Sequence, residues 1–89
     1  MSNYFGLRFD QTCRACPEQY DVYDDDRLVG YVRLRHGHLL GEYLDRDGVW
    51  KPTYQWTFSE PHKGLFTSQE EREVHLADIA LQIQTKLTG

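Results

Sequence analysis

Hydrophobic and polar residues alternate along most of residues 18–58, and short polar turns interrupt the alternation three times. Alternation with a period of two is typical of a β-strand that buries one face. The last interruption, Asp47-Gly48, favours a two-residue type I′ hairpin turn. The pattern therefore predicts four consecutive antiparallel strands, at residues 18–23, 27–35, 38–45 and 49–58.

The lengths of these turns set the expected register, because antiparallel partners keep a constant index sum. We expect two-residue loops at Asp47-Gly48 and His36-Gly37, and a three-residue loop at residues 24–26 with one Asp near the left-handed region. The expected pairs are Arg46 with Val49, Tyr43 with Pro52, Gly41 with Tyr54, Leu39 with Trp56, Leu34 with Leu39, Val32 with Gly41, Val22 with Leu28 and Tyr20 with Gly30. The apolar face then consists of Tyr20, Val22, Gly30, Val32, Leu34, Leu39, Gly41, Tyr43, Trp50, Tyr54, Trp56 and Phe58. Because proline donates no hydrogen bond, we expect the last strand to lie at an edge or to bulge at Pro52.

Residues 3–10 also alternate, with Phe5, Leu7 and Phe9 on one side, and this predicts a strand before the meander. Its apolar side chains need a surface to cover them. We expect part of that cover to come from the outer face of the meander, which carries Val29, Tyr31, Leu40 and Leu44.

The chain after residue 66 has the features of one helix. Residues 67–70 and residues 68–71 both match the capping box, so two starting points are open. Apolar residues then recur at helical spacing, at Leu76, Ile79, Ala80, Ile83 and Leu87. This stripe predicts a helix that covers the aromatic face of the sheet.

With 89 residues, the chain is expected to form a single domain over residues 1–89. The predicted fold class is α+β. We expect an antiparallel β-meander of four to five strands, followed by one C-terminal α-helix packed on the sheet.

The charge of the chain limits the classes of partner. Its formal net charge is −4 and its pI is about 5.4, whereas domains that grip nucleic acid through their overall charge are usually basic. No apolar run reaches the length of a membrane span, and residues 1–4 lack the basic and apolar regions of a signal peptide. We therefore expect an acidic, cytoplasmic protein without a membrane partner.

Two cysteines are separated by two residues, at Cys13 and Cys16. This spacing can place two thiolates on one zinc ion, and His36 and His38 would complete a Cys2His2 set if their loop folds back on the cysteines. The alternative is a turn with two reduced thiols. The sequence leaves both open.

The predicted third strand carries basic and aromatic residues on the face opposite the core. Arg27, Arg33 and Arg35 flank Tyr31, and His38 lies beside Arg35 across the hairpin. Arginines next to an aromatic ring suit a protein-binding hot spot, and they also suit phosphates and a stacked base. The alternative is an ordinary solvated face with cross-strand pairs.

The sequence does not predict an enzyme. A hydrolase needs a nucleophile, a base and an orienting carboxylate in mutual reach, and nothing in the spacing of Ser59, Ser68, His62 and His75 connects them. The three consecutive aspartates at residues 24–26 point apart in a tight turn, so they do not form a cation site.

Three segments together carry a resemblance. The first is residues 24–44, which contain Val29-Gly30-Tyr31-Val32-Arg33-Leu34-Arg35-His36-Gly37. The second is the tripeptide Gly64-Leu65-Phe66, and the third is the helix opening Glu70-Glu71-Arg72. Together they resemble small uncharacterised proteins carried by phages and other mobile elements. This resemblance implies an accessory role. Separately, residues 37–83 are similar in their order of strands and helix to the amino-terminal DNA-binding domains of some tyrosine integrases, which bind DNA with a sheet face.

These observations favour a small non-enzymatic cytoplasmic binding protein that acts through protein–protein contacts, of the phage-type accessory or inhibitor class. The predicted contact residues are Arg27, Tyr31, Arg33, Arg35 and His38. One alternative is a nucleic-acid-binding module that uses the same face. The other is a zinc-stabilised module built on Cys13 and Cys16, with His36 and His38 as further ligands.

Overall fold

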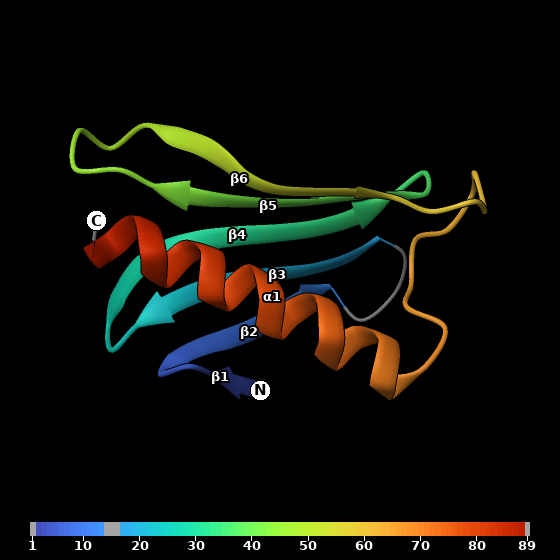
Figure 1. The fold of residues 1–89 in the computed structure, drawn as a ribbon, viewed down its shortest axis with the longest axis horizontal. Helices are drawn as coiled ribbons and strands as arrows, with labels where there is room; N and C mark the ends of the chain where they lie inside the picture. The colour runs from blue at the N-terminus through green and yellow to red at the C-terminus, as the bar shows by residue number, and fades with distance from the viewer. Residues whose placement is uncertain (1, 14–16, 89) are drawn as a thin grey trace.

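The computed structural model describes residues 2–13 and 17–88. The protein has two layers, an antiparallel sheet of six strands and one helix that crosses one face of the sheet (Figure 1). Each strand pairs with the strand before it, so the sheet order is β1-β2-β3-β4-β5-β6. The elements are β1 (Ser2–Tyr4), β2 (Leu7–Cys13), β3 (Glu18–Asp24), β4 (Arg27–Arg35), β5 (His38–Leu44), β6 (Trp50–Thr57) and α1 (Gln69–Thr88). The predicted α+β meander with a C-terminal helix is confirmed, and it has more strands than expected.

The additional strand comes from the amino-terminal segment. The single strand predicted at residues 3–10 is two strands, β1 and β2, joined by a turn at Phe5-Gly6 where both residues have positive φ, 50° and 81°. Phe5 is therefore exposed rather than inward. Leu7 and Phe9 are fully buried, and Phe9 pairs with Val22 on the face that the helix covers. The expectation that the outer face of the meander would cover them is wrong, because β2 extends the same inward face.

The register at the centre of the sheet matches the prediction. Leu34 pairs with Leu39 and Val32 with Gly41 across the hairpin at His36-Gly37, where both loop residues have positive φ. Further along, Leu39 pairs with Trp56 and Gly41 with Tyr54.

The register between β3 and β4 differs from the prediction. The loop consists of Asp25 and Asp26, and Asp25 has the expected positive φ, 55°. A bulge follows, so Val22 pairs with Gly30 and Tyr20 with Val32 instead of with Leu28 and Gly30. The shift is two residues, so Tyr20 and Val22 keep their inward orientation. Val29 is the extra residue of the bulge and is 2% exposed, although the alternation placed it on the outer face.

The hairpin between β5 and β6 also differs. The Asp45 carboxylate accepts hydrogen bonds from the amides of Asp47 and Val49 at 2.9 Å each, and the Asp45 amide donates to the Val49 carbonyl. The loop therefore has three residues ending at Gly48, whose φ is 77°, and it is not the predicted two-residue type I′ turn.

This longer loop shifts the pairs near the end of the hairpin by one position. Tyr43 pairs with Lys51 and Leu44 with Trp50, so the predicted pair of Tyr43 with Pro52 is wrong. The predicted pair of Arg46 with Val49 is wrong too, because Arg46 lies in the loop and the Asp45 amide bonds to Val49 instead. A bulge between Gly41 and Glu42 restores the expected register beyond it. The prediction of an edge or bulged strand at Pro52 is confirmed, because β6 is both.

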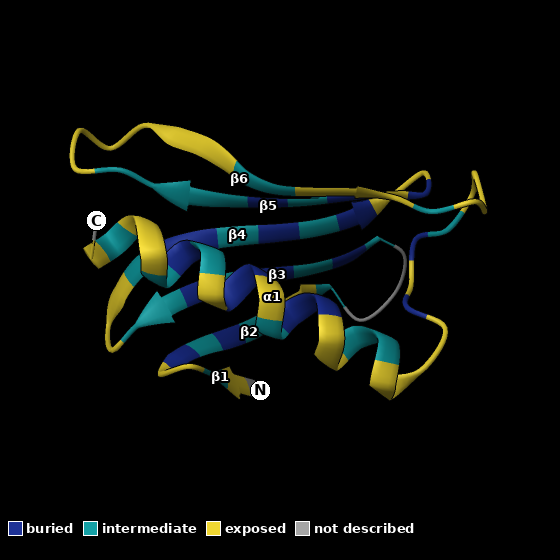
Figure 2. Ribbon diagram, in the orientation of Figure 1, coloured by how far each residue is buried: buried dark blue, intermediate teal, exposed yellow. Residues whose placement is uncertain are grey.

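The helix begins where one of the two capping boxes predicted. The Ser68 hydroxyl oxygen accepts a hydrogen bond from the Glu71 amide at 3.1 Å, and the Glu71 carboxylate accepts one from the Thr67 amide at 2.9 Å. The buried face of α1 turns toward the sheet, whereas β6 is mostly exposed (Figure 2). The core consists of Leu7, Phe9, Tyr20, Val22, Val29, Val32, Leu34, Leu39, Phe66, Leu76, Ile79, Ala80 and Ile83.

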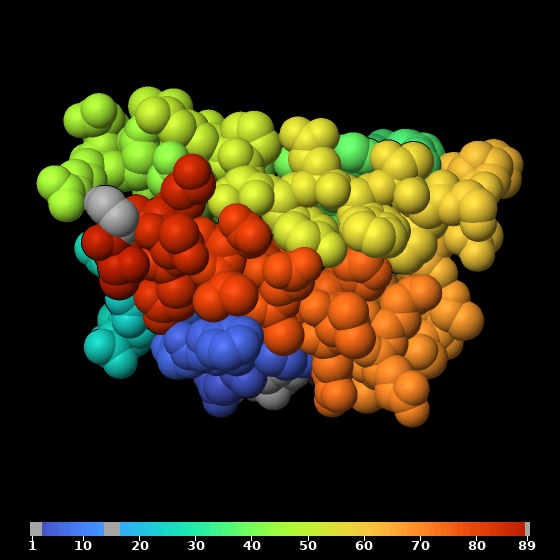
Figure 3. All heavy atoms as spheres, in the orientation of Figure 1, coloured from blue at the N-terminus to red at the C-terminus, as the bar shows by residue number. Residues whose placement is uncertain are grey.

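Two glycines let the helix approach the sheet closely. A Cβ atom on Gly30 would lie 2.7 Å from Cδ1 of Ile83, and one on Gly41 would lie 3.1 Å from Cγ2 of Ile79. As a result, α1 lies against the sheet between the amino-terminal strands and β6 (Figure 3).

Candidate functional site

The sheet face that points away from α1 carries the candidate site, and we call it the outer face. In β4, the buried residues Gly30, Val32 and Leu34 alternate with Tyr31 and Arg33, which are only half-buried and belong to the outer face. Within the described residues α1 is the one helix, and it lies on the opposite face.

Four half-buried or exposed apolar side chains lie on this face, and we call them the outer patch. Its members are Tyr31, Leu40, Leu44 and Trp50. The rings of Tyr31 and Trp50 meet edge to face with centroids 6.4 Å apart, and the Tyr31 hydroxyl donates to Oε1 of Gln19 at 3.1 Å. The hydrogen bond orients the Tyr31 ring, and the ring contact places Trp50 beside it, so the patch presents two adjacent aromatic rings.

A basic cluster adjoins the outer patch at the hairpin between β4 and β5. Arg33 pairs with Leu40 and Arg35 with His38, so four side chains form a rectangle on one face. Together with His36 they line a shallow hollow of about 390 Å³, which we call the hairpin hollow.

Local contacts orient part of this cluster. Arg35 donates a hydrogen bond from Nε to Nε2 of His36 at 3.1 Å, and the backbone of His36 has a positive φ of 53°. Nδ1 of His38 lies 3.4 Å from the hydroxyl of Thr57 on β6.

The two arginines of the hairpin hollow have no carboxylate partner. In the part of the chain that the structure describes, the ion pairs within 4.0 Å join Arg8 to Asp10, Arg27 to Asp24, Lys51 to Asp45, Lys63 to Glu71 and Arg72 to Glu18. Arg33 and Arg35 are absent from all of these pairs. Their charges are therefore available to a ligand, although the protein as a whole is acidic.

One of the predicted contact residues lies elsewhere. Because of the bulge at Val29, Arg27 pairs with Asp24 at the start of β4 and makes an exposed ion pair with it at 3.6 Å. It lines a different hollow, of about 570 Å³, with Arg46 and Lys86 beside the carboxyl end of α1. The structure thus brings Tyr31, Arg33, Arg35 and His38 together and separates Arg27 from them, which corrects the sequence interpretation of Arg27.

The sequence interpretation also missed Trp50. The alternation assigned it to the inward face, but its partner Leu44 is an outer residue, and Trp50 therefore joins Tyr31. Trp56, six residues further along β6, remains on the helix side at the sheet edge and is 51% exposed. Pro52 was the sequence signal for an irregular strand, but it did not indicate which residues would change face.

The zinc hypothesis stays a prediction. Cys13 lies half-buried at the end of β2, and Cys16 lies outside the described residues. His36 and His38 lie on the hairpin between β4 and β5, where His36 contacts Arg35. Among residues 2–13 and 17–88, no three His, Cys, Asp or Glu side chains form a group that could hold a metal ion.

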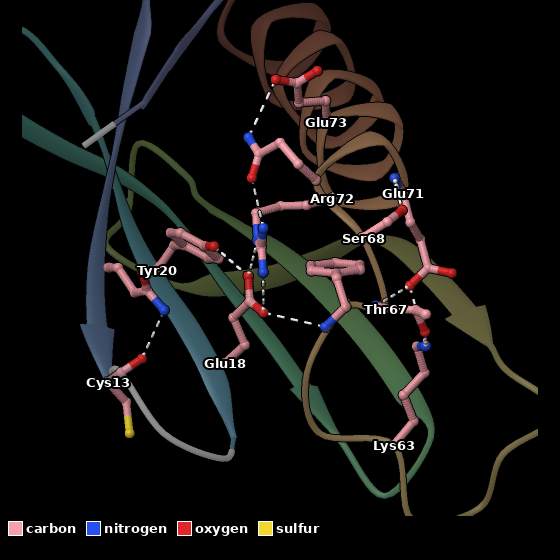
Figure 4. A network of polar contacts seen from close by, with 12 residues as sticks. Cys13, Glu18, Tyr20, Lys63, Thr67, Ser68, Glu71, Arg72 and Glu73 are labelled. Carbon is pink, nitrogen blue, oxygen red and sulfur yellow. Dashed lines mark hydrogen bonds and ion pairs between the residues drawn. The ribbon is translucent and has the colours of Figure 1, made fainter.

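A buried polar cluster joins β3 to the start of α1 (Figure 4). The carboxylate of Glu18 has no exposed surface, and it accepts hydrogen bonds from the Tyr20 hydroxyl, from Nε and Nη2 of Arg72 at 2.6 and 3.2 Å, and from the Phe66 amide at 3.2 Å. Burial alone would raise the pKa of Glu18, but the hydrogen bonds from Arg72, Tyr20 and Phe66 outweigh it and hold this pKa below its usual value. Burial and the adjacent carboxylate raise the pKa of Tyr20. Since every donor is directed at one carboxylate, we assign the cluster to the stability of the fold.

Aromatic rings surround His75, which is 8% exposed. Phe66 stacks on its imidazole, the rings of Trp56 and Phe58 meet it edge to face with centroids 5.3 Å away, and the Tyr54 hydroxyl lies 2.9 Å from Nδ1. Burial lowers the pKa of His75. Of the candidate hydrolase residues, His75 therefore packs in the core and Ser68 caps the helix.

Comparisons with protein-family models, with curated proteins and with solved structures find no match for this chain. Within its described residues, no helix combines the length and the hydropathy that a transmembrane span requires.

Proposed function

We propose that this protein is a small non-enzymatic binding protein that acts in the cytoplasm through contacts with a protein partner, in an accessory or inhibitory role. The observation that carries the proposal is the outer patch, where the rings of Tyr31 and Trp50 are in contact beside the unpaired guanidinium of Arg33. Tryptophan, tyrosine and arginine are the residues most enriched in the hot spots of protein interfaces.

The charges around the outer patch favour a protein over a nucleic acid. Glu42 lies directly across from Tyr31, and Asp10 pairs with Asp21 on the same face. Phosphates laid along the whole face would meet these carboxylates. A protein partner can place apolar groups over the rings and acidic groups only at the basic end.

The test is capture of a partner from lysate of cells that harbour this protein, followed by a binding measurement with the isolated partner. The double variant Tyr31→Ala/Trp50→Ala removes both rings of the outer patch. We expect it to weaken binding by roughly 2 kcal/mol or more, which is about thirtyfold in Kd.

The matched control is Val74→Ala, which truncates an exposed apolar side chain on α1. It should bind like the wild type, and circular dichroism should show that all variants remain folded. Equal capture by the double variant and the wild type would refute the choice of the outer face.

The second candidate is a nucleic-acid-binding module that uses the same face. The adjacent rings of Tyr31 and Trp50 and the two neighbouring arginines, Arg33 and Arg35, support it, since bases stack on aromatic rings and guanidinium groups hold phosphates. Fluorescence anisotropy of labelled single- and double-stranded nucleic acid, at low and moderate salt, tests it. Binding that falls steeply with salt and is lost in Arg33→Ala/Arg35→Ala would favour this candidate, because displaced counterions govern such affinities.

A further inference from the structure

We propose that the hairpin hollow binds a phosphoryl group that the protein partner presents on a phosphorylated side chain. This inference rests on the proposed function and specifies the chemistry of the partner. It concerns Arg33, Arg35, His36, His38 and Leu40, which line the hollow.

The spacing of the two guanidinium groups suits a single tetrahedral ligand. Arg33 and Arg35 are two positions apart on one strand, so their Cβ atoms are separated by roughly 7 Å on the same face. The long side chains can close this distance from both sides of one group. The side chains of Leu40 and His38, across the hairpin, form the other half of the rectangle.

Among residues 2–13 and 17–88, no carboxylate neutralises either arginine. No ion pair of the described residues includes either of them, and the nearest outer-face carboxylate along β5, Glu42, pairs with Tyr31 instead. Two adjacent like charges without a counterion repel each other. A ligand that carries about two negative charges relieves this repulsion, and a phosphorylated side chain carries about that charge near neutral pH.

The hollow is also organised before any ligand arrives. The contact between Nε of Arg35 and Nε2 of His36 occupies one donor and leaves the terminal nitrogens of the guanidinium free. The half-buried Leu40 forms an apolar part of the wall, which strengthens nearby electrostatic interactions. Guanidinium groups match the oxygens of a phosphoryl group with paired, directional hydrogen bonds, and three such oxygens are available to two arginines.

A single carboxylate satisfies this site less well. It carries one charge and two oxygens, so it neutralises one arginine and leaves the other unpaired. A phosphodiester carries one charge per group, and further phosphates of a strand would meet Glu42 beside the outer patch. The hollow therefore favours a phosphomonoester on a protein segment whose apolar side chains cover Tyr31 and Trp50.

The test is titration of the full chain, followed by nuclear magnetic resonance, with four probes. They are inorganic phosphate, a phosphoserine peptide, the same peptide with serine, and the same peptide with glutamate. We expect the phosphoserine peptide to give saturable shifts at the Nε–H resonances of Arg33 and Arg35, with inorganic phosphate binding at the same place more weakly. The serine and glutamate peptides should bind at least about tenfold more weakly than the phosphoserine peptide.

Charge variants distinguish a site from a general charge effect. Arg33→Gln and Arg35→Gln should each reduce the affinity for the phosphoserine peptide at least about tenfold. Arg46→Gln removes the same charge at an exposed loop position outside the hollow, and it should change the affinity less than twofold, roughly the size of a screened surface effect. Equal losses in all three variants, or shifts that do not saturate, would overturn the proposal.

Two further outcomes are decisive. If the glutamate peptide binds as tightly as the phosphoserine peptide, the hollow is not selective for phosphoryl groups and the inference fails. If a 5′-phosphorylated oligonucleotide binds more tightly than the phosphoserine peptide, the source of the phosphoryl group is nucleic acid and the inference fails as well.

Failure of this inference can be distinguished from failure of the proposed function. The variant Tyr31→Ala/Trp50→Ala keeps both arginines, so it should still bind inorganic phosphate at the hairpin hollow. Partner capture that depends on the outer patch, without any phosphate binding, would refute only the inference. If phosphate binds at the hairpin hollow but no captured partner requires the outer patch, the proposed function is refuted instead.

Discussion

Glu18 and Arg72 are 54 positions apart in the sequence, yet Nε of the arginine lies 2.6 Å from Oε2 of the glutamate. The glutamate side chain is fully buried, whereas the arginine is partly exposed. The same carboxylate also accepts a hydrogen bond from the Phe66 amide. One buried charge thus holds together β3, the segment before the helix and α1.

Removal of Arg72 should therefore destabilise the protein strongly. In Arg72→Met, the Glu18 carboxylate stays buried without its cation, and such a loss costs about 3 to 5 kcal/mol. Urea unfolding followed by circular dichroism measures this change. The control is Arg27→Gln, whose ion pair with Asp24 is exposed and should contribute less than about 1 kcal/mol. Similar small losses in both variants would contradict the structural role of the cluster.

Stability should fall as the pH is lowered below 6.5 because of His75. Burial has the largest effect and lowers the pKa of this imidazole from its ordinary value of 6.5. The carboxylates of Glu71 and Asp78 raise the same pKa, and the charge of Lys63 lowers it further. The unfolded chain then binds a proton more readily than the folded chain, so stability is complete above 6.5 and declines as the pH falls toward the lowered pKa.

Urea midpoints on both sides of pH 6.5 measure this decline. His75→Phe keeps a ring in the same aromatic surroundings but does not titrate, so its midpoint should be nearly constant across that window. His62→Gln changes an exposed histidine and should retain the decline. The same decline in His75→Phe would assign the effect to another group.

A second acid transition should follow at lower pH. The pKa of Glu18 is held below its ordinary value of 4.5, because its hydrogen bonds outweigh the effect of burial. The contribution of this carboxylate is present above pH 4.5 and is lost as the pH falls through the lowered pKa. In Glu18→Gln, stability at neutral pH should be lower, and the slope of stability against pH below 4.5 should be smaller than in the wild type. An unchanged slope would contradict the assignment.

Gly30→Ala should separate the helix from the sheet. Its methyl group would lie 2.7 Å from Cδ1 of Ile83 and 3.1 Å from the carbonyl oxygen of Glu42, and overpacking of this kind costs about 1 to 3 kcal/mol. Ile83→Val removes Cδ1 and should cost about 0.5 to 1.5 kcal/mol alone. In the double variant the two losses should be less than additive, which a double-mutant cycle of thermal unfolding measures. Simple additivity would show that the two sites do not share this contact.

The Ser68 cap should contribute measurably to the helix. Ser68→Ala leaves the Glu71 amide without its acceptor, and we expect a loss of about 1 kcal/mol. Ser59→Ala, at an exposed position in the loop after β6, should be close to neutral. Chemical denaturation of both variants provides the comparison, and an equal effect would exclude the cap as the cause.

Much of the sheet was predictable because alternation and turn residues agree. His36-Gly37 adopts positive φ at both positions, so the pairs of Leu34 with Leu39 and of Arg35 with His38 follow from the sequence. That register also brings three of the predicted contact residues, Arg33, Arg35 and His38, together at the hairpin hollow. The helix and its stripe were equally clear, since the spacing and the cap indicate the same element.

The remaining errors have local physical causes. The Asp45 side chain accepts two loop amides and stabilises a longer turn, a competition between side chain and backbone that the Asp47-Gly48 dipeptide does not reveal. The resulting shift places Trp50 on the outer face. Phe5 has a positive φ that non-glycine residues seldom adopt, so the first hairpin had no turn signal. Glu18 was not predicted as a buried residue, because its partner is too distant in sequence for any local pattern to connect them.

The order of the elements also determines how the protein is made. Each strand after β1 pairs with its predecessor, so the sheet can grow hairpin by hairpin as the chain leaves the ribosome. Its apolar face, however, is covered by α1 and by Phe66 just before it, which are synthesised after all the strands. Until residues 69–88 emerge, a nascent chain presents that face to other proteins, and chaperone binding or aggregation competes with closure during this interval. Truncation before the helix should thus leave the apolar face of the sheet uncovered and promote aggregation, although every strand remains.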